Sequence, residues 1–167
     1  MSGLSFRYRL ICHSTFNPPV VISFDEVGPL RLKPVGGGHP DRLPAPYSRK
    51  GTMQLLLAFN YYHGTFFGRL RKMKTAKNIL SFFRELRQQY AAGQRIYIIM
   101  DNLSAHVTGN IVKWAKKISV SFALPPTNTY CPNPIECHMG DIQRLVLKDT
   151  DYRSWPEVDE ALQSAIR

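Results

Sequence analysis

The chain has 167 residues, 44% of them hydrophobic, which suits one globular domain with one core. Its formal net charge of +10 favours a polyanionic partner, with nucleic acid as the first candidate and an anionic membrane surface as the second. The longest apolar runs, such as LLLAF and IYIIM, are too short to cross a bilayer, which excludes a membrane-spanning protein. Because the chain opens without a signal-like stretch and has only three cysteines, we expect reduced thiols and a cytoplasmic location.

The first half of the chain predicts β-strands. Residues 20–24 form a β-branched apolar run typical of a buried strand, which we expect to end at Asp25. The alternating stretch LRLKP at 30–34 predicts a second strand, and the glycine- and proline-rich residues 34–51 predict a flexible loop. The stretch TMQLLLAFNYYHGTFFGRL predicts a strand, a turn near Gly64 and another strand. Short links between these strands predict antiparallel hairpins.

In the second half strands alternate with helices, which predicts parallel pairing. We therefore predict an α/β fold of the ribonuclease-H-like, retroviral-integrase-like class, with a mixed five-stranded sheet flanked by helices. Residues 1–19 would be a lead-in and residues 20–167 the domain. The expected elements are a helix from Thr75 to about Gly93, a strand over 95–101, a helix over 106–117, a strand over 119–124, a helix from about Pro134, and a last helix whose Ser154 and Glu157 have capping-box spacing.

Three carboxylates lie at the ends of predicted elements. Asp25 and Asp101 each follow a buried strand, and neighbouring parallel strands are about 4.8 Å apart, so both acids would meet at one sheet edge. The proline-rich residues 124–138 then bring Glu136 to the first turn of a helix. Three carboxylates at one edge are hard oxygen ligands suited to Mg²⁺ or Mn²⁺, and two such ions serve phosphodiester chemistry.

Each acid also has a plain structural interpretation. An aspartate after a strand is often a turn residue or a helix N-cap. Glu136 has capping-box spacing from Asn133, and closing that box could be its whole role. Glu26 follows Asp25 directly, so we expect it on the opposite sheet face, away from the ligands.

Three motifs resemble one family of DNA-processing enzymes. SFDEVGPLRLKP, IIMDNLSAH and PPTNTYCPNPIE resemble the DDE transposases of bacterial insertion sequences, in the branch related to mariner elements. That branch places 34 residues between its second aspartate and its glutamate, as Asp101 and Glu136 do here. The resemblance extends from about Val20 to the C-terminus. It implies a ribonuclease-H-like DDE endonuclease core, two Mg²⁺ or Mn²⁺ ions, and a catalytic, metal-binding triad of Asp25, Asp101 and Glu136.

The resemblance also implies a reaction and partners. The reaction would be cleavage of DNA at transposon ends, followed by strand transfer into target DNA in the bacterial cytoplasm, at the nucleoid. Such transposases carry an N-terminal helix-turn-helix domain, which the lead-in of this chain is too short to hold. We therefore expect either the second half of a split transposase, working with a separate helix-turn-helix polypeptide and as a homodimer, or a truncated, non-catalytic basic DNA-binding remnant.

Further residues are candidates for contact with the substrate. Asn102 and His106 belong to the DNLSAH motif and could contact DNA or orient a carboxylate, although His106 could equally begin the next helix and pack there. A basic cluster is expected to bind DNA phosphates, with a solvated basic face as the alternative. Its members are Arg69, Arg71, Lys72, Lys74 and Lys77, with Arg49 and Lys50 in the preceding loop.

Overall fold

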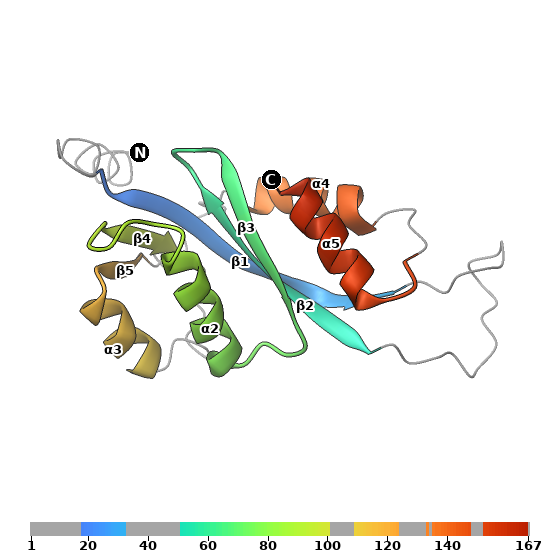
Figure 1. Cartoon of the computed structure of the whole chain (residues 1–167), viewed down its shortest axis with the longest axis horizontal. Coiled ribbons are helices and arrows are strands. Elements are labelled where there is room, and N and C mark those ends of the chain that lie inside the picture. Colours follow the sequence, from blue (N-terminus) through green and yellow to red (C-terminus); the bar gives the residue numbers. More distant parts are fainter. Residues whose placement is uncertain are drawn as a thin grey trace.

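The described residues form a five-stranded sheet with helices on both faces (Figure 1). In the computed structural model of the protein these residues are 18–32, 51–100, 109–123, 133, 135–147 and 152–166. The elements are β1 (Val20–Arg31), β2 (Thr52–Asn60), β3 (Thr65–Arg71), α2 (Ala76–Arg87), β4 (Ile96–Ile99), α3 (Gly109–Lys117), β5 (Val120–Ala123), α4 (Ile135–Leu147) and α5 (Trp155–Ala165). Of the helices in these ranges, none has the length and apolar character needed to cross a membrane.

The sheet is mixed, as the sequence predicts. Its strand order is β3-β2-β1-β4-β5. Strands β1, β2 and β3 pair antiparallel, whereas β4 pairs parallel with both β1 and β5. The long central strand β1 joins the two halves, because it pairs with β2 from Ile22 to Arg31 and with β4 only from Val20 to Ser23.

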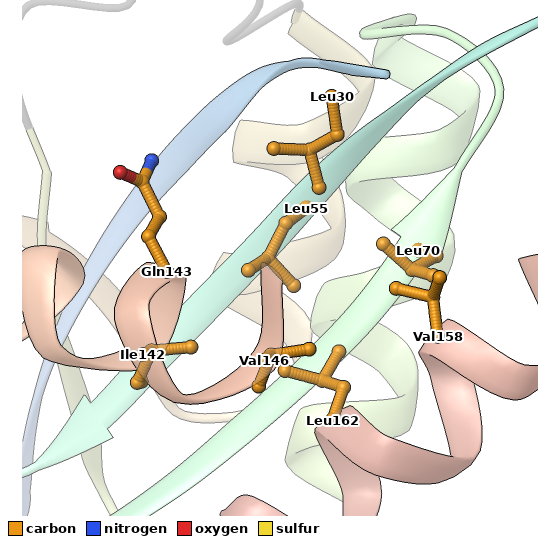
Figure 2. A pocket seen from close by; sticks show the side chains of 8 residues that line it. All are labelled: Leu30, Leu55, Leu70, Ile142, Gln143, Val146, Val158 and Leu162. Carbon is orange, nitrogen blue, oxygen red and sulfur yellow. The ribbon is translucent and has the colours of Figure 1, made fainter. Parts of the chain in front are cut away.

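Side-chain alternation along the strands builds two cores. On one face, Ile22 and Phe24 of β1 pack under α2 and α3, and the Phe24 ring lies 5.4 Å from that of Phe82 and 4.9 Å from that of Phe83. The other core holds α4 and α5 on the opposite face. Figure 2 shows the apolar side chains that meet there: Leu30, Leu55, Leu70, Ile142, Val146, Val158 and Leu162.

Strand β1 is longer than the sequence suggests. The strand expected to end at Asp25 and the separate strand expected at 30–34 belong to one strand, whose register with β2 shifts between Val27 and Leu30. The prediction of a separate strand is wrong, because pairing with β2 resumes at Leu30 and Arg31 after this irregularity. Asp25 therefore lies inside β1, two residues beyond its last pair with β4.

Helix α2 begins where the sequence predicts and ends earlier. The Thr75 hydroxyl oxygen accepts a hydrogen bond from the Asn78 amide at 3.2 Å, as an N-cap does. The helix ends at Arg87 and not near Gly93. A tighter turn follows it, in which the Tyr90 amide donates to the Arg87 carbonyl at 3.2 Å.

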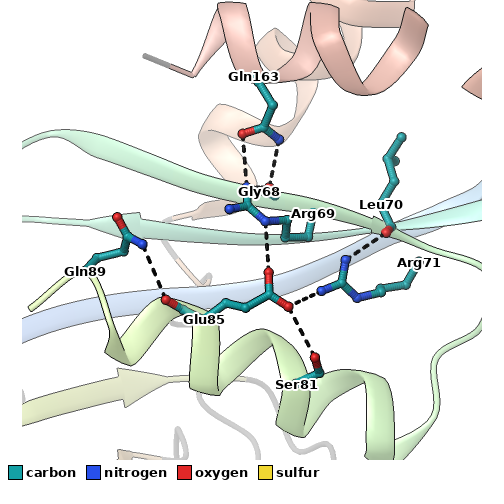
Figure 3. Close-up of polar contacts among 8 residues, drawn as sticks. All are labelled: Gly68, Arg69, Leu70, Arg71, Ser81, Glu85, Gln89 and Gln163. Atoms are coloured by element: carbon teal, nitrogen blue, oxygen red, sulfur yellow. Dashed lines mark hydrogen bonds and ion pairs between the residues drawn. The ribbon is translucent and has the colours of Figure 1, made fainter. Parts of the chain in front are cut away.

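The edge strand β3 is covered by α5. Gln163 Nε2 donates to the Gly68 carbonyl oxygen at 3.1 Å, and Gln163 Oε1 accepts from Arg69 Nη1 at 3.0 Å (Figure 3). Gly68 permits this close approach, since a Cβ there would lie 3.2 Å from Ile166 Cδ1 and 3.5 Å from Leu162 Cδ2. The Gly68 carbonyl oxygen on the open edge of the sheet is thus hydrogen-bonded by a side chain of α5.

Candidate active site

Asp25 lies on the central strand, on the sheet face that carries α4 and α5. Along β1 it alternates with Phe24 and Glu26, and Val27, on the same face as Asp25, packs in the core under these two helices. Asp25 is half-buried, and its Oδ1 accepts a hydrogen bond from the Glu26 amide at 2.7 Å. The sheet therefore holds this carboxylate on a well-fixed backbone.

Asp25 and Asp101 have the same offset in sequence from the last residue pair between β1 and β4. The last parallel pair joins Ser23 to Ile99. Asp25 and Asp101 each follow two residues later in the sequence, and two residues is the repeat at which strand side chains return to the same face. Met100, the last described residue of this segment, is fully buried in the α2 core, which is the face opposite to Asp25.

The first turn of α4 is attached to β1 beside Asp25. Asn133, just before the helix, is 2% exposed. Its Nδ2 donates to the Phe24 carbonyl oxygen at 2.9 Å, and its Oδ1 accepts a hydrogen bond from the Ser23 hydroxyl. Its own carbonyl oxygen accepts from the Glu136 amide at 2.8 Å. Hydrogen bonds through Asn133 thus connect Ser23 and Phe24, the two residues before Asp25, to the backbone of Glu136. Glu136 itself is exposed.

These bonds decide against a capping box between Asn133 and Glu136. In a capping box the first side chain bonds to the helix amides, but both polar atoms of the Asn133 side chain bond to β1. At the start of α5, Glu157 accepts from the Arg153 amide at 2.9 Å and from the Ser154 hydroxyl at 2.7 Å, and the Ser154 side chain makes no capping bond to a helix amide there either. Glu136 is therefore not explained by that capping role.

Glu26 points away from Asp25, as the sequence predicts. Its carboxylate pairs with Lys74 Nζ at 2.9 Å, in the segment between β3 and α2, and its side chain is 4% exposed. Its second oxygen, Oε1, is buried and has no hydrogen-bond partner within the described ranges. This acid belongs to the packing under α2.

The basic cluster divides into paired and free cations. Arg69 Nε lies 3.0 Å from Glu85 Oε2, and Arg71 pairs with Glu85 Oε1, which also accepts from the Ser81 hydroxyl at 3.2 Å (Figure 3). The Arg69 guanidinium also lies over the Phe67 ring, 4.3 Å from its centroid. Both arginines are held between β3 and α2, an arrangement that the sequence alone does not predict, and their contact with DNA stays a prediction.

Several other cations are exposed. Lys72 and Lys77 are exposed, and in the described part of the chain neither has an ion-pair partner. The structure adds a second group of exposed cations, on the outer surfaces of α2 and α3, that sequence reasoning missed. Its only sequence signal was the excess of cations over acids, because Glu85 is the one acid of α2 and α3 has none. Its members are Arg84, Lys113, Lys116 and Lys117. The predicted residues outside the described ranges are Arg49, Lys50, Asp101, Asn102 and His106.

The donor chemistry of the site suits a hard divalent cation. Asp25 and Glu136 supply carboxylate oxygens, the ligands that Mg²⁺ and Mn²⁺ prefer. The described residues contain no group of three His, Cys, Asp or Glu side chains placed to hold a metal ion. Two of the three predicted acids are within those ranges, and the third, Asp101, is not.

Comparison with known sequences gives one family. A family model described as DDE superfamily endonuclease matches residues 24–159, a range that includes all three predicted acids. No curated protein sequence matches the chain.

Solved retroviral integrases have the same fold. A chain of the simian T-cell lymphotropic virus intasome, in complex with the PP2A regulatory subunit B56 gamma, has a TM-score of 0.64 at 12% identity, covering 98% of this chain and 61% of that chain. The HTLV-2 integrase catalytic core domain in complex with magnesium, in a dimeric form, has a TM-score of 0.61 at 15% identity, covering 89% and 87%. The catalytic core domain of BIV integrase has a TM-score of 0.58 at 15% identity, covering 87% and 80%. The predicted ribonuclease-H-like fold is confirmed.

Proposed function

The chain belongs to the DDE superfamily endonucleases, and on that premise we propose that it is the catalytic core of a DNA transposase. The transposase would serve a bacterial insertion sequence related to mariner elements. It would cleave DNA at the element's ends and join the ends to target DNA, in the bacterial cytoplasm at the nucleoid. A homodimer and a separate helix-turn-helix polypeptide are its proposed protein partners. The HTLV-2 integrase core has been solved in both a dimeric and a trimeric form, so the oligomeric state of this chain has to be measured.

The observation that carries the proposal is the attachment of α4 to β1. Asn133 ties the helix start to the two strand residues that precede Asp25, so Glu136 belongs to a helix turn fixed beside that acid. The equal offset of Asp25 and Asp101 from the Ser23–Ile99 pair supports a place for Asp101 on the same face. Three acids from distant parts of the sequence would then share one sheet edge.

Each acid has a role in this proposal. Asp25, Asp101 and Glu136 would hold two Mg²⁺ or Mn²⁺ ions, which supply an activated attacking oxygen and a stabilised leaving oxygen in phosphodiester cleavage. Asp25 contributes from the rigid central strand, and Glu136 from a helix that rests on an apolar core. The ions would contact the scissile phosphate, and the three carboxylates would hold the ions.

DNA would be held mainly through its phosphates. The first contacts we propose are two exposed lysines, Lys72 just after β3 and Lys77 in the first turn of α2. Arg49 and Lys50, which lie outside the described residues, are proposed to join them. Arg69 and Arg71 would contribute less, since Glu85 already neutralises part of their charge. The exposed lysines of α3 would extend the basic surface.

The test is a strand-cleavage assay on supercoiled and pre-nicked DNA, with Mg²⁺ or Mn²⁺ and with chelator. Wild-type cleavage should require the metal. Asp25→Asn, Asp101→Asn and Glu136→Gln should each lower it by orders of magnitude, because each keeps the side-chain shape but removes a charge that holds the ions. Asp141→Asn is the matched control, an exposed acid on the same helix as Glu136 whose described partner is Arg144. Full metal-dependent cleavage by Asp101→Asn would refute the triad.

The competing function is that of a non-catalytic, basic DNA-binding remnant. The net charge of +10 is its support. It predicts that the wild-type chain binds DNA and cuts nothing, even in the presence of a helix-turn-helix polypeptide of the kind proposed above. That result would replace the enzyme proposal.

A further inference from the structure

We propose that Asn133 is the positioning residue for Glu136, acting through its two side-chain bonds to β1. The inference rests on the proposed function and gives a role to an asparagine inside the third motif, three residues before its glutamate. Asn133 does not bind the metal in this proposal. It fixes the position of the first turn of α4 relative to Asp25. It thereby fixes the position from which the Glu136 carboxylate can reach a metal ion.

Apolar packing alone leaves this position loosely defined. Helix α4 rests on the sheet through Ile135, Ile142 and Val146, and such contacts are non-directional. A small slide or rotation of the helix costs them little, whereas a metal-binding constellation needs its side chains held to within about 0.5 Å. Hydrogen bonds have preferred directions and lengths, so a buried pair of them is suited to removing this freedom.

Asn133 supplies such a pair at the point where it matters. Its amide donates through Nδ2 to the Phe24 carbonyl and accepts through Oδ1 from the Ser23 hydroxyl, so one planar group contacts two consecutive residues of β1. The next residue of the strand is Asp25. On the helix side, the Asn133 carbonyl accepts from the Glu136 amide. One residue therefore links the strand that carries one acid to the helix turn that carries another.

The chemistry of the contact explains why asparagine stands there. Of the side chains of this size, the amide alone presents one donor and one acceptor in a fixed plane. Aspartate would place a second oxygen against the Phe24 carbonyl, and alanine would leave the buried Ser23 hydroxyl without this acceptor. A purely structural buried asparagine would show the same bonds, so the test must separate stability from position.

The structure offers a matched control in Asn60. It is also buried, at 3% exposure, and its Oδ1 accepts from the Tyr62 amide at 2.9 Å while its Nδ2 donates to the Tyr90 hydroxyl at 3.1 Å. It ends β2, paired with Ile22 one residue before Ser23, but its bond to Tyr90 places its side chain on the α2 face of the sheet, opposite to Asn133. Asn60→Ala should therefore cost comparable folding stability without touching the link between β1 and α4.

The experiment compares the full wild-type chain with Asn133→Ala, Ser23→Ala and Asn60→Ala. Amide hydrogen exchange of α4 and α5 is measured without metal, and Mn²⁺ affinity is measured by electron paramagnetic resonance. Asn133→Ala should speed exchange in the first turns of α4 more than in α5, and weaken Mn²⁺ binding about 10-fold or more, the range seen when supports of metal ligands are removed. Ser23→Ala, which removes one bond of the two, should give a smaller effect of the same kind. Asn60→Ala should leave Mn²⁺ affinity unchanged.

The outcomes are distinct. If Asn133→Ala and Ser23→Ala both keep wild-type exchange in α4 and wild-type Mn²⁺ affinity, the inference is overturned while the proposed function stands. If the wild-type chain binds no Mn²⁺, the proposed function fails, and the exchange measurement alone still decides whether Asn133 fixes the helix. Should Asn133→Ala fail to fold, Ser23→Ala decides by the same two measurements.

Discussion

Lys74 and Glu26 form an ion pair of 2.9 Å on the sheet face opposite to Asp25. Two adjacent acids of β1 therefore have different surroundings. Glu26 is almost fully buried beneath the segment that leads into α2, whereas Asp25 is on the face of α4. A buried carboxylate requires such a partner, because an uncompensated charge inside a protein is strongly destabilising.

Because of this ion pair, we expect Glu26→Gln to lower the stability of the fold and to leave DNA cleavage nearly unchanged. The change leaves Lys74 without its counter-ion, so the free energy of unfolding should fall by about 1–3 kcal/mol. Metal-dependent cleavage at a temperature where the variant is folded should stay within a few-fold of wild type. Urea denaturation and the strand-cleavage assay measure the two quantities.

Asp25→Asn is the contrasting variant on the same strand. It should abolish cleavage and leave the free energy of unfolding unchanged or higher, since it removes a carboxylate from a site proposed to hold two others. Loss of cleavage by folded Glu26→Gln would mean that Glu26 acts in the site.

The glycine in the covered edge strand yields a second prediction. Gly68→Val should lower the free energy of unfolding by about 1–3 kcal/mol, because a Cβ there would already lie 3.2 Å from Ile166 Cδ1 and 3.3 Å from Leu57 Cδ1, and the two methyl groups of valine need further room. Gly140→Ala is the control: Gly140 is exposed within α4, nothing lies within 4 Å of the position that a Cβ would take there, and the change should raise the free energy of unfolding by about 0.5–1 kcal/mol. Equal effects of both changes would contradict the close packing of α5 on β3.

Much of this fold follows from local sequence patterns. The β-branched run at 20–24, the Thr75 N-cap and the alternation of strands with helices after residue 95 all predict elements that the structure contains. These signals depend on neighbouring residues, which is why they are visible without a structure. The length of β1 was not predictable in this way, because its continuation past Gly28 depends on pairing with β2, a distant segment.

In the candidate site, too, the features that depend on local sequence are predictable and those that depend on contacts between distant segments are not. The three acids are predicted from their positions in the sequence and from a family spacing, but the contacts of Asn133 with β1 are not predictable in this way. An asparagine three residues before a glutamate at a helix start has the pattern of a capping box, and the tertiary contact with Ser23 and Phe24 overrides it. Likewise a run of arginines and lysines looks uniformly free in sequence, and only the packing of β3 against α2 assigns two of them to Glu85.

Burial of Tyr90 predicts a dependence of stability on alkaline pH. Desolvation raises the pKa of its phenol above 10.0, and the hydrogen bond with Asn60 opposes that rise. The unfolded chain therefore releases this proton first as the pH increases, so Tyr90 contributes stability below about pH 10 that is lost as the pH rises through the folded-state pKa. Tyr90→Phe should flatten the fall in unfolding free energy between about pH 9.5 and pH 11.

Urea denaturation at a series of pH values measures that slope. Tyr62→Phe is the matched variant. It also removes one phenol, but from a residue that is 75% exposed. A Tyr90→Phe slope equal to that of the wild type would show that ionisation of this phenol is not linked to folding.

The cations of the basic cluster should fall into two groups, one that binds DNA and one that stabilises the fold. Lys72→Gln and Lys77→Gln should each weaken binding to every duplex alike, because they remove phosphate contacts that carry no sequence information. Each should also reduce the slope of log affinity against log salt by about 1. Arg71→Gln should instead lower the free energy of unfolding, since its ion pair with Glu85 joins β3 to α2, and should change DNA affinity little.

Fluorescence anisotropy with two unrelated labelled duplexes, over a range of salt concentrations, measures affinity and slope together. Glu85→Gln is the informative control, because it should lower stability as Arg71→Gln does while freeing Arg69 and Arg71 to bind phosphate, and so tighten DNA binding. If Arg71→Gln weakens DNA binding as much as Lys72→Gln, the arginine contacts phosphate despite its pairing with Glu85. A strong preference for one duplex at moderate salt would contradict phosphate-dominated binding, because none of the proposed contacts reaches a base edge.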